Sequence, residues 1–418
     1  MQARIKAIYQ KLEGDRVIWM AAFFLGLLSI LAVFSAMTTL AVKNGGYGQF
    51  LKHFAMLSAG FGMMYIVHKR RFKFFLNKSA YFYLIAAALL VITIFFGTNI
   101  NNAGRWIRIP GIGISFQSSD IAKIALIIFT ASWLHKRREK LDDFNGTITP
   151  LLGFIGVICL LILPSNFSTA AMLALVCFVL MYIAGVPWRH LFKIIGFGVG
   201  FLVLIIMLGE FGPKGVLPRY DTWKNRILNK VDADSEGNYQ SNLAQYAIYQ
   251  GGVIPKGPGT STTRNFLPHP YSDMVYAFVI EEYGSILGGA GLLLIYIILF
   301  FRTVRFTSKC DHQFGRLVAI GLSLLLVVQA LINMGVSVNL FPTTGQPLPL
   351  VSLGGTSTIL TCISIGIILS VSRSVYNPEA YLASPAVDEE TDEEILIEET
   401  NEPNVHSVEN KTNQFTSV

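Results

Sequence analysis

Charged side chains are scarce in this sequence of 418 residues: Asp, Glu, Lys and Arg make up 14% of it, against roughly 25% in soluble globular domains. Cysteine is scarcer still: the sequence has four, too few for disulfide bonds to hold together a chain of this length. Apolar residues make up 52%, and the mean hydropathy is +0.52. These values exclude a soluble protein, a mostly disordered chain and a disulfide scaffold. They leave a helical protein that crosses a membrane several times.

The motifs of common soluble enzymes are missing as well. No HExxH, CxxC or GxSxG motif occurs. Residues 252–257 have the spacing of a phosphate-binding loop, but Pro258 and Gly259 stand where Lys and Ser or Thr must follow. The sequence therefore predicts no nucleotide cofactor.

Ten apolar runs follow one another along the chain. They cover residues 17–36, 50–68, 79–97, 120–134, 150–164, 168–185, 191–209, 275–301, 317–338 and 354–372. Lys and Arg gather before the first run and after the even-numbered runs, whereas the other gaps hold few of them. Short loops rich in Lys and Arg stay in the cytoplasm. The pattern predicts an all-α polytopic membrane protein with ten transmembrane helices and both termini in the cytoplasm, and it argues against nucleic acid as the partner of these basic residues.

The same pattern divides the chain into parts. Residues 1–16 form a cytoplasmic N-terminal segment, and residues 17–377 form the ten-span domain. Residues 378–418 hold eleven of the 26 acidic residues, and we expect them to be a disordered cytoplasmic tail. Residues 210–274 form a large extracytoplasmic loop between spans seven and eight. Because this loop has an amphipathic stretch at 241–249 and aromatic anchors, we expect it to be ordered and functional.

Ionisable residues at membrane depth are costly and therefore point to function. Asp273 stands at the start of the eighth run, at the outer boundary between water and lipid. A carboxylate there could act as a general base. The alternative is that Ser272 or Asp273 is the N-terminal cap of the helix.

Two more acids, Glu281 and Glu282, lie within the eighth run. Adjacent acids in an apolar helix cannot both face lipid. One could pair with a buried base while the other lines a cavity. The alternative is that the span begins later and both are interfacial.

Basic side chains near the fourth run suggest anion binding. Asp120 and Lys123 are three residues apart and share one helix face, either as part of a site or as a plain intrahelical pair. Arg105 and Trp106 precede this run. An Arg fork matches phosphate oxygens, and Trp suits a membrane interface, so the alternative is contact with lipid headgroups.

Prolines and paired glycines in residues 347–355 lead into the tenth run. At membrane depth they predict non-helical backbone, which is tolerated where it is buried or lines a cavity. All these candidate residues flank spans four, eight and ten near the outer face. This arrangement favours an anionic, lipid-linked substrate.

Four groups of motifs resemble one family of membrane proteins, the SEDS family of peptidoglycan glycosyltransferases. The motifs lie at 104–106 with 117–123, at 239–240 with 247–252, at 266–268 with 272–273 and 281–284, and at 349–355. The resemblance covers roughly residues 15–375. It is closer to the FtsW branch of the family than to the RodA branch.

The resemblance implies an enzyme of the bacterial cytoplasmic (inner) membrane with its active site on the outer face. It would polymerise lipid II, an undecaprenyl-diphosphate-linked disaccharide peptide, into β-1,4-linked glycan strands during septal wall synthesis in cell division. The family's catalytic acid falls on Asp273. Its substrate-binding positions are expected at Arg105, Trp106, Lys123, Asp120, Glu281, Tyr239, Gln240 and Ser352. The implied partners are a class B penicillin-binding protein transpeptidase and other divisome proteins, and a divalent cation (Mg or Mn) could assist.

Three other functions stay open. They are an elongation-type, RodA-like polymerase, a lipid II flippase or transporter, and a scaffold that recruits a transpeptidase. The chain also departs from the family pattern. Asp120 replaces the usual Glu, Asn166 stands where an acid is common, and Thr344 stands where a base is common.

Overall fold

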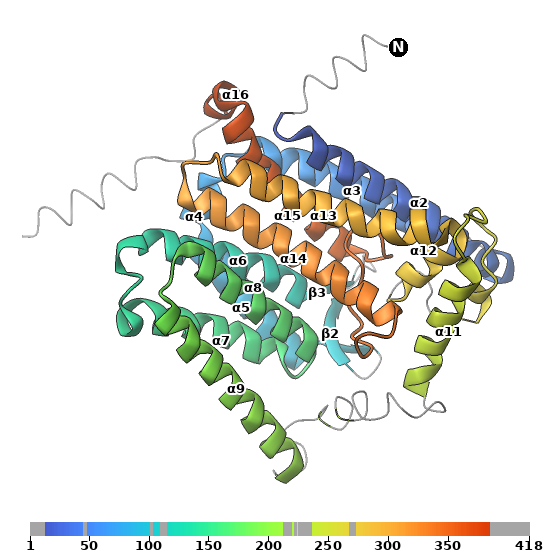
Figure 1. The fold of residues 1–418 in the computed structure, drawn as a ribbon, viewed down its shortest axis with the longest axis horizontal. Helices are drawn as coiled ribbons and strands as arrows, with labels where there is room; N and C mark the ends of the chain where they lie inside the picture. Colours follow the sequence, from blue (N-terminus) through green and yellow to red (C-terminus); the bar gives the residue numbers. More distant parts are fainter. Residues whose placement is uncertain are drawn as a thin grey trace, which may run out of the picture.

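The computed structural model describes residues 13–44, 48–100, 103–108, 115–211, 220, 224, 236–266 and 273–384. Helices within these residues run back and forth along one bundle (Figure 1). Ten passes match the ten predicted runs: α2 (Arg16–Asn44), α3 (Gly48–Lys69), α5 (Ser79–Phe96), α6 (Ser118–Lys136), α7 (Thr149–Ile162), α8 (Phe167–Ala184), α9 (Trp188–Phe211), α12 (Val275–Tyr283) continued by η4 (Gly284–Ala290) and α13 (Gly291–Thr307), α14 (Gln313–Ser337) and α15 (Thr356–Tyr376).

The shorter elements lie between these passes. They are α4 (Lys73–Asn77), η1 (Arg138–Lys140), η2 (Phe144–Ile148), α11 (Glu236–Gly251), η3 (Thr263–Asn265) and α16 (Pro378–Leu382). Helix α11 contains the predicted amphipathic stretch.

Nine helical segments among the described residues are long and apolar enough to cross a membrane. The predicted fold class, a helical multi-pass membrane protein, is confirmed. Helix α6 is the tenth pass, and it is less apolar because its first two turns carry Asp120 and Lys123. The count of ten membrane spans therefore stays a prediction.

Figure 1 shows the two ends of the bundle. One end carries α11 and the start of α12, and we call it the α11 end. The other end carries α4 and α16, and we call it the α16 end. Glu13 contacts Lys69 and Arg373 there, so the first and the last described residues lie at the same end.

Helices α14 and α15 lie mostly inside the bundle, whereas α9 exposes most of its length. Small residues let α3 and α15 approach closely. A Cβ atom on Gly60 would lie 2.9 Å from the Cys362 sulfur, and one on Gly366 would lie 2.9 Å from the Met64 carbonyl oxygen. This is the close packing of helices that small residues permit in membranes.

Two ordered elements differ from the sequence expectations. A small antiparallel sheet of β1 (Thr98–Ile100), β2 (Ala103–Arg108) and β3 (Ser115–Gln117) connects α5 to α6. Strands of three to six residues are too short to show a clear period of two in the sequence.

The tail predicted to be disordered begins with helix α16. Tyr381 of this helix stacks on Phe72 with ring centroids 5.5 Å apart, and Arg71 donates a hydrogen bond to the Leu382 carbonyl. These contacts order residues that composition alone assigned to the tail. Residues 385–418 lie outside the described part of the chain.

Candidate functional site

Asp273 lies at the α11 end, two residues before α12 begins at Val275. The N-cap position of this helix falls on Met274, which makes no side-chain capping bond. The N-cap is therefore not Asp273, and Ser272 lies outside the described residues. Asp273 is partly exposed, and its carbonyl oxygen accepts a hydrogen bond of 2.8 Å from the Asn333 side chain.

The backbone between α14 and α15 is irregular, as the sequence predicts. Leu350 has a φ of 65°, and side chains from three helices cap the carbonyl groups of this segment. Asn333 donates to the Gln346 carbonyl (2.8 Å), and Gln329 donates to the Pro347 carbonyl (2.8 Å). Tyr296 donates to the Pro349 carbonyl (2.5 Å), and Ser29 donates to the Val351 carbonyl (2.9 Å). Each bond satisfies a backbone group that membrane hydrocarbon could not satisfy.

Ser352 closes a turn of the same segment. Its hydroxyl oxygen accepts a hydrogen bond of 2.8 Å from the Leu348 amide, and the residue is buried. Its predicted contact with substrate is not tested by this geometry.

Lys123 and Asp120 form an ion pair of 2.8 Å in which both side chains are less than a tenth exposed. The Lys123 ammonium also donates to the Gln329 amide oxygen at 3.2 Å. The pair lines a small pocket between α6, α14 and α15. The other polar side chains of its wall are Gln329, Ser357, Thr361 and Ser364. A buried cation in a polar pocket is suited to hold an anionic group.

The small sheet brings two of the predicted motifs together. Trp106 of β2 lies opposite Gln117 of β3, directly before the helix that carries Asp120 and Lys123. Trp106 is partly buried. The backbone of Arg105 lies in β2, but its side chain is outside the described part of the structure.

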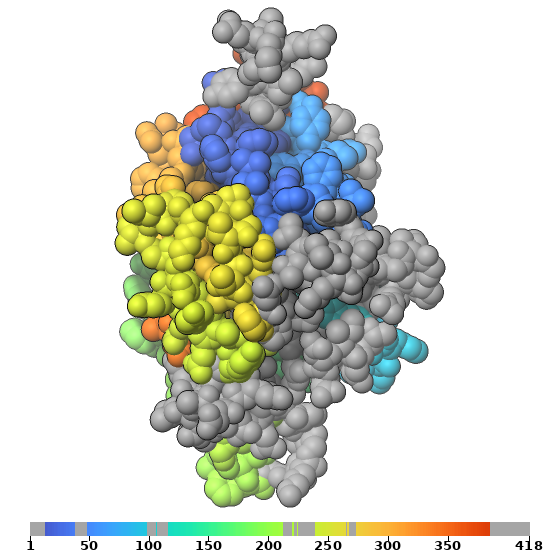
Figure 2. Space-filling model, turned by 90° about the vertical axis from the view of Figure 1, so that its right-hand side faces the viewer, coloured from blue at the N-terminus to red at the C-terminus, as the bar shows by residue number. Residues whose placement is uncertain are grey.

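The acids of α12 bind the loop that follows α11. Glu281 is 2% exposed, and its carboxylate accepts hydrogen bonds from Ser261, Thr262 and Thr263. Glu282 is fully buried and accepts from the Gly259 amide at 2.8 Å and from the Ser35 hydroxyl. Both acids are therefore buried within the protein, and the alternative of a later span start stays open. Figure 2 looks onto this end, where the yellow-green residues of α11 and its loop lie beside the blue residues of α2.

Tyr239 and Gln240 lie in the first turns of α11. Tyr239 is half exposed, and Gln240 lies one turn before the buried Ala244. Ala244 and Ala247 pack against Met274, directly after Asp273. Helix α11 therefore covers the start of α12, and the predicted substrate contacts of Tyr239 and Gln240 remain predictions.

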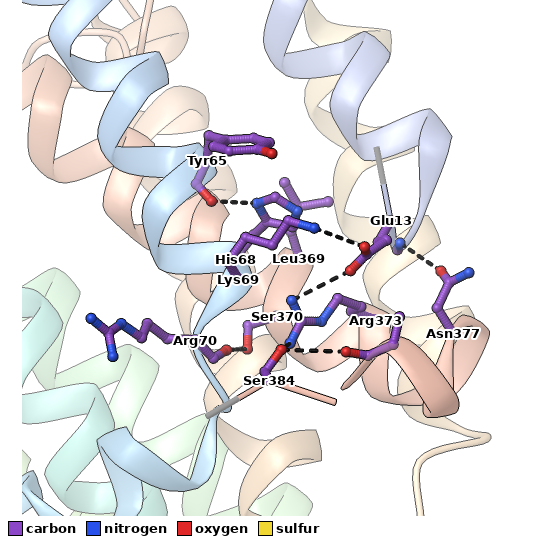
Figure 3. Close-up of polar contacts among 12 residues, drawn as sticks. Glu13, Tyr65, His68, Lys69, Arg70, Leu369, Ser370, Arg373, Asn377 and Ser384 are labelled. Atoms are coloured by element: carbon purple, nitrogen blue, oxygen red, sulfur yellow. Dashed lines mark hydrogen bonds and ion pairs between the residues drawn. The ribbon is translucent and has the colours of Figure 1, made fainter. Parts of the chain in front are cut away.

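A second polar cluster occupies the α16 end (Figure 3). Glu13 binds Lys69 at 2.7 Å and contacts Arg373 at 3.4 Å, and Arg373 donates to Ser384 at 2.6 Å. The cluster joins the N-terminal segment, α3, α15 and the residues after α16. Its groups bind one another, which favours a structural role.

Within the described residues, no group of three His, Cys, Asp or Glu side chains is placed to hold a metal ion. The Asp120 carboxylate is paired with Lys123, and the Glu281 carboxylate accepts several donors from one loop. The described residues thus do not form a ligand set for the divalent cation.

Gln329 and Asn333 are the functional candidates that the sequence analysis missed. They are polar residues four apart within the predicted apolar run 317–338, so they share one face of α14. That spacing was a signal for them, because polar residues inside a span are usually functional.

Comparisons with known proteins agree with the observed fold. The model of the FtsW/RodA/SpoVE family of cell cycle proteins matches residues 15–377. A probable peptidoglycan glycosyltransferase FtsW of Hydrogenovibrio crunogenus is 30% identical over 84% of this chain and 90% of its own. The stage V sporulation protein E of Bacillus subtilis is 27% identical over 87% of this chain and 98% of its own.

Solved structures share the fold at lower identity. A chain from a peptidoglycan synthase complex, 22% identical, covers 87% of this chain and 99% of its own with a TM-score of 0.69. The rod shape determining protein RodA of Thermus thermophilus, also 22% identical, covers 87% and 98% with a TM-score of 0.62. The family match and the relatives lead to one conclusion: this chain belongs to the FtsW/RodA/SpoVE family of cell cycle proteins.

Proposed function

We propose that this chain is an FtsW-type peptidoglycan glycosyltransferase that polymerises lipid II into β-1,4-linked glycan during septal wall synthesis. Membership of the family and the name of the Hydrogenovibrio relative support this function. One structural observation carries it. Asp273 and the Lys123 pocket are tied to adjacent carbonyl groups, those of Gln346 and Pro347, at one end of a membrane bundle.

Asp273 is the general base in this proposal. The 4-hydroxyl of the acceptor sugar attacks the anomeric carbon of the donor, and its proton passes to the Asp273 carboxylate. The bond from the anomeric carbon to the diphosphate oxygen breaks, with inversion at the donor carbon. A positioned base of this kind contributes about 10²–10⁴-fold to the rate.

The leaving group is undecaprenyl diphosphate, which gains negative charge as the bond breaks. The Lys123 ammonium would hold one of its phosphates, and Arg105 would hold another from β2. Charge-assisted hydrogen bonds that strengthen in the transition state lower the barrier. Asp120 would keep the Lys123 ammonium in place through their ion pair.

The proposal places the α11 end outside the cytoplasm. The α16 end carries the basic gaps, including Lys69, Arg70 and Arg71 after α3 and Arg305 near the end of α13. Such loops stay in the cytoplasm. Both termini would then be cytoplasmic, and Asp273 would face the compartment where the wall is built. A class B penicillin-binding protein and other divisome proteins would be its partners.

A polymerisation assay tests this function. The purified protein receives labelled lipid II, with and without the partner transpeptidase, and the glycan product is separated by size. We expect Asp273→Asn to lose at least about 100-fold in rate and to insert into membranes as the wild type does. Glu139→Gln is the matched control, because Glu139 is 85% exposed. Full glycan synthesis by Asp273→Asn contradicts the assignment.

Two observations separate the alternatives. A flippase would move lipid II across vesicles that contain the purified protein and would make no glycan. An elongation-type polymerase would make glycan, but a tagged copy would lie along the cell wall instead of at the septum.

A further inference from the structure

Gln329 and Asn333 link the two halves of the candidate site through one buried face of α14. Gln329 is 6% exposed and Asn333 is 1% exposed. Each side chain makes two hydrogen bonds, one toward a predicted site residue and one toward the segment between α14 and α15. Residues four apart on a helix lie one above the other, so the two links run side by side.

The bonds form two short bridges. Gln329 accepts from the Lys123 ammonium at 3.2 Å and donates to the Pro347 carbonyl at 2.8 Å. Asn333 donates to the Asp273 carbonyl and to the Gln346 carbonyl, both at 2.8 Å. The two bridges therefore end on carbonyl groups of consecutive residues.

The segment that receives both bridges is fixed at further points. Gln346 donates to the Thr169 hydroxyl at 2.5 Å, and Tyr296 donates to the Pro349 carbonyl at 2.5 Å. Ser29 donates to the Val351 carbonyl at 2.9 Å. Donors from α2 and α13 and an acceptor from α8 thus hold the segment from outside α14. It can serve as a common reference for both halves of the site.

We infer that Gln329 and Asn333 are positioning residues, which hold the diphosphate-binding Lys123 and the base Asp273 in a fixed relation to the same backbone segment. This inference rests on the proposed function. Gln329 acts through Lys123 and should affect the binding of the diphosphate. Asn333 acts through the Asp273 backbone and should affect the chemical step. The base and the cation must be held within a fraction of an ångström for efficient catalysis.

The first test measures binding without turnover. Undecaprenyl diphosphate is titrated into the purified full chain in detergent for the wild type, Gln329→Met, Lys123→Met and the double variant. We expect each single variant to bind about tenfold more weakly, in line with the loss of a charge-assisted contact. The double variant should bind no more weakly than Lys123→Met, because coupled residues are not additive.

A second variant separates the two bonds of Gln329. Gln329→Glu keeps an acceptor for the Lys123 ammonium but cannot donate to the Pro347 carbonyl. If the fixed segment matters, Gln329→Glu should still bind more weakly than the wild type. Additive losses in the double variant, or wild-type binding by Gln329→Met, would overturn the role of Gln329. Unchanged binding by Lys123→Met would instead remove the proposed role of Lys123.

The test for Asn333 compares turnover with binding. Asn333→Leu keeps a branched side chain but has no donor, and Asn333→Ser keeps one donor. We expect kcat to fall about 10- to 100-fold in the first and less in the second, while KM for lipid II and the number of undecaprenyl diphosphate sites per chain stay unchanged. A merely structural role would lower the number of sites together with kcat.

Ser323→Ala is the matched control on α14. Ser323 is fully buried, and its hydroxyl donates to the Ile320 carbonyl of its own helix. It should change neither kcat nor binding. The inference for Asn333 is overturned if Asn333→Leu keeps the wild-type kcat. It is also overturned if the number of undecaprenyl diphosphate sites per chain falls in proportion to kcat. If the wild type makes no glycan, the proposed function fails, whereas the binding cycle still tests Gln329.

Discussion

Glu281 and Glu282 are consecutive in the chain, yet their carboxylates hold different parts of the same loop. Glu281 accepts from the Thr262 amide at 2.9 Å and from the Ser261 hydroxyl at 2.5 Å. Glu282 accepts from the Gly259 amide at 2.8 Å. The Glu282 carbonyl also accepts from the amides of residues 256 and 257. The two acids thus hold the loop after α11 against α12.

This arrangement changes the expected role of Glu281. Its carboxylate is occupied by the loop, so an effect on substrate would act through the loop. We expect Glu281→Leu to leave two backbone amides and three hydroxyls without this acceptor, at about 1–3 kcal/mol for each group that stays buried and unsatisfied. Hydrogen exchange at the Thr262 and Thr263 amides should become at least tenfold faster. Glu281→Gln keeps one acceptor oxygen and should have an intermediate effect.

The control for this prediction is Glu139→Leu, since Glu139 is 85% exposed. It should leave exchange in the loop unchanged. Equal exchange rates in Glu281→Leu and the wild type would show that other contacts hold the loop and that the hydrogen bonds to Glu281 do not stabilise it.

Removal of Lys123 should separate stability from binding. Lys123→Met leaves the Asp120 carboxylate buried without its cation, and breaking a buried pair costs about 3–5 kcal/mol. Replacing both residues, as Asp120→Asn with Lys123→Met, removes the unpaired charge. We expect the double variant to regain most of the lost thermal stability in detergent but none of the binding of undecaprenyl diphosphate. Binding that returns together with stability would mean that Lys123 is only half of a structural pair.

The sequence predicted the passes of the bundle well because each apolar run is long. All ten predicted runs coincide with helices, with limits that agree within a few residues at most ends. The predicted non-helical backbone before α15 is also present, because prolines and paired glycines act locally. The small sheet and α16 were not predicted, since contacts between distant residues, such as Tyr381 with Phe72, order them.

The candidate site was only partly predictable for the same reason. Asp273, Lys123 and Asp120 stand out in the sequence because they are charged at membrane depth. Their connection does not, since it runs through Asn333 and Gln329, whose partners lie on other segments. The loop partners of Glu281 were equally hidden. A single sequence gives the residues that could act, and the fold determines which of them share a contact.

The burial of His312 should make the stability of the folded protein depend on pH. It lies just before α14, and its pKa is lowered from 6.5 to about 4 by burial, with smaller contributions from His135, Lys73 and Arg138. The folded protein therefore holds His312 neutral at pH 7. Between pH 6.5 and 4 the unfolded chain binds more protons at this residue than the folded chain does, so stability is lost as the pH falls through this window.

The measurement is the melting temperature in detergent at pH 7.5 and at pH 5. We expect the wild type to melt several degrees lower at pH 5 and His312→Phe to show a smaller difference. Phe keeps the ring contact with Phe72, which is 5.2 Å away between centroids. An identical pH dependence in His312→Phe would assign the effect to other groups, of which the neighbouring His135 is the first to test.

Arg373 has the largest fully buried side chain among the described residues. We expect it, and with it the α16 end, to contribute to stability and not to catalysis. Its guanidinium contacts Glu13 and Ser384 and lies 5.5 Å from the Tyr381 ring centroid. Arg373→Met removes the cation that these groups face and leaves Glu13 with Lys69 as its remaining partner among the contacts in Figure 3. Because the Arg373 side chain is fully buried and packs against the Tyr381 ring, we expect the melting temperature to fall when these contacts are lost.

The matched control is Arg138→Met. Arg138 is 61% exposed and lies 3.9 Å from Glu139, which is 85% exposed, so we expect this pair to contribute about zero to stability. Polymerisation per folded molecule should stay at the wild-type level in both variants, since Arg373 and Asp273 lie at opposite ends of the bundle. A selective loss of kcat in Arg373→Met, with an unchanged melting temperature, would contradict this division. It would mean that the joined chain ends influence the distant site through α15, which carries Arg373 at one end and lines the Lys123 pocket with Ser357 and Thr361 at the other.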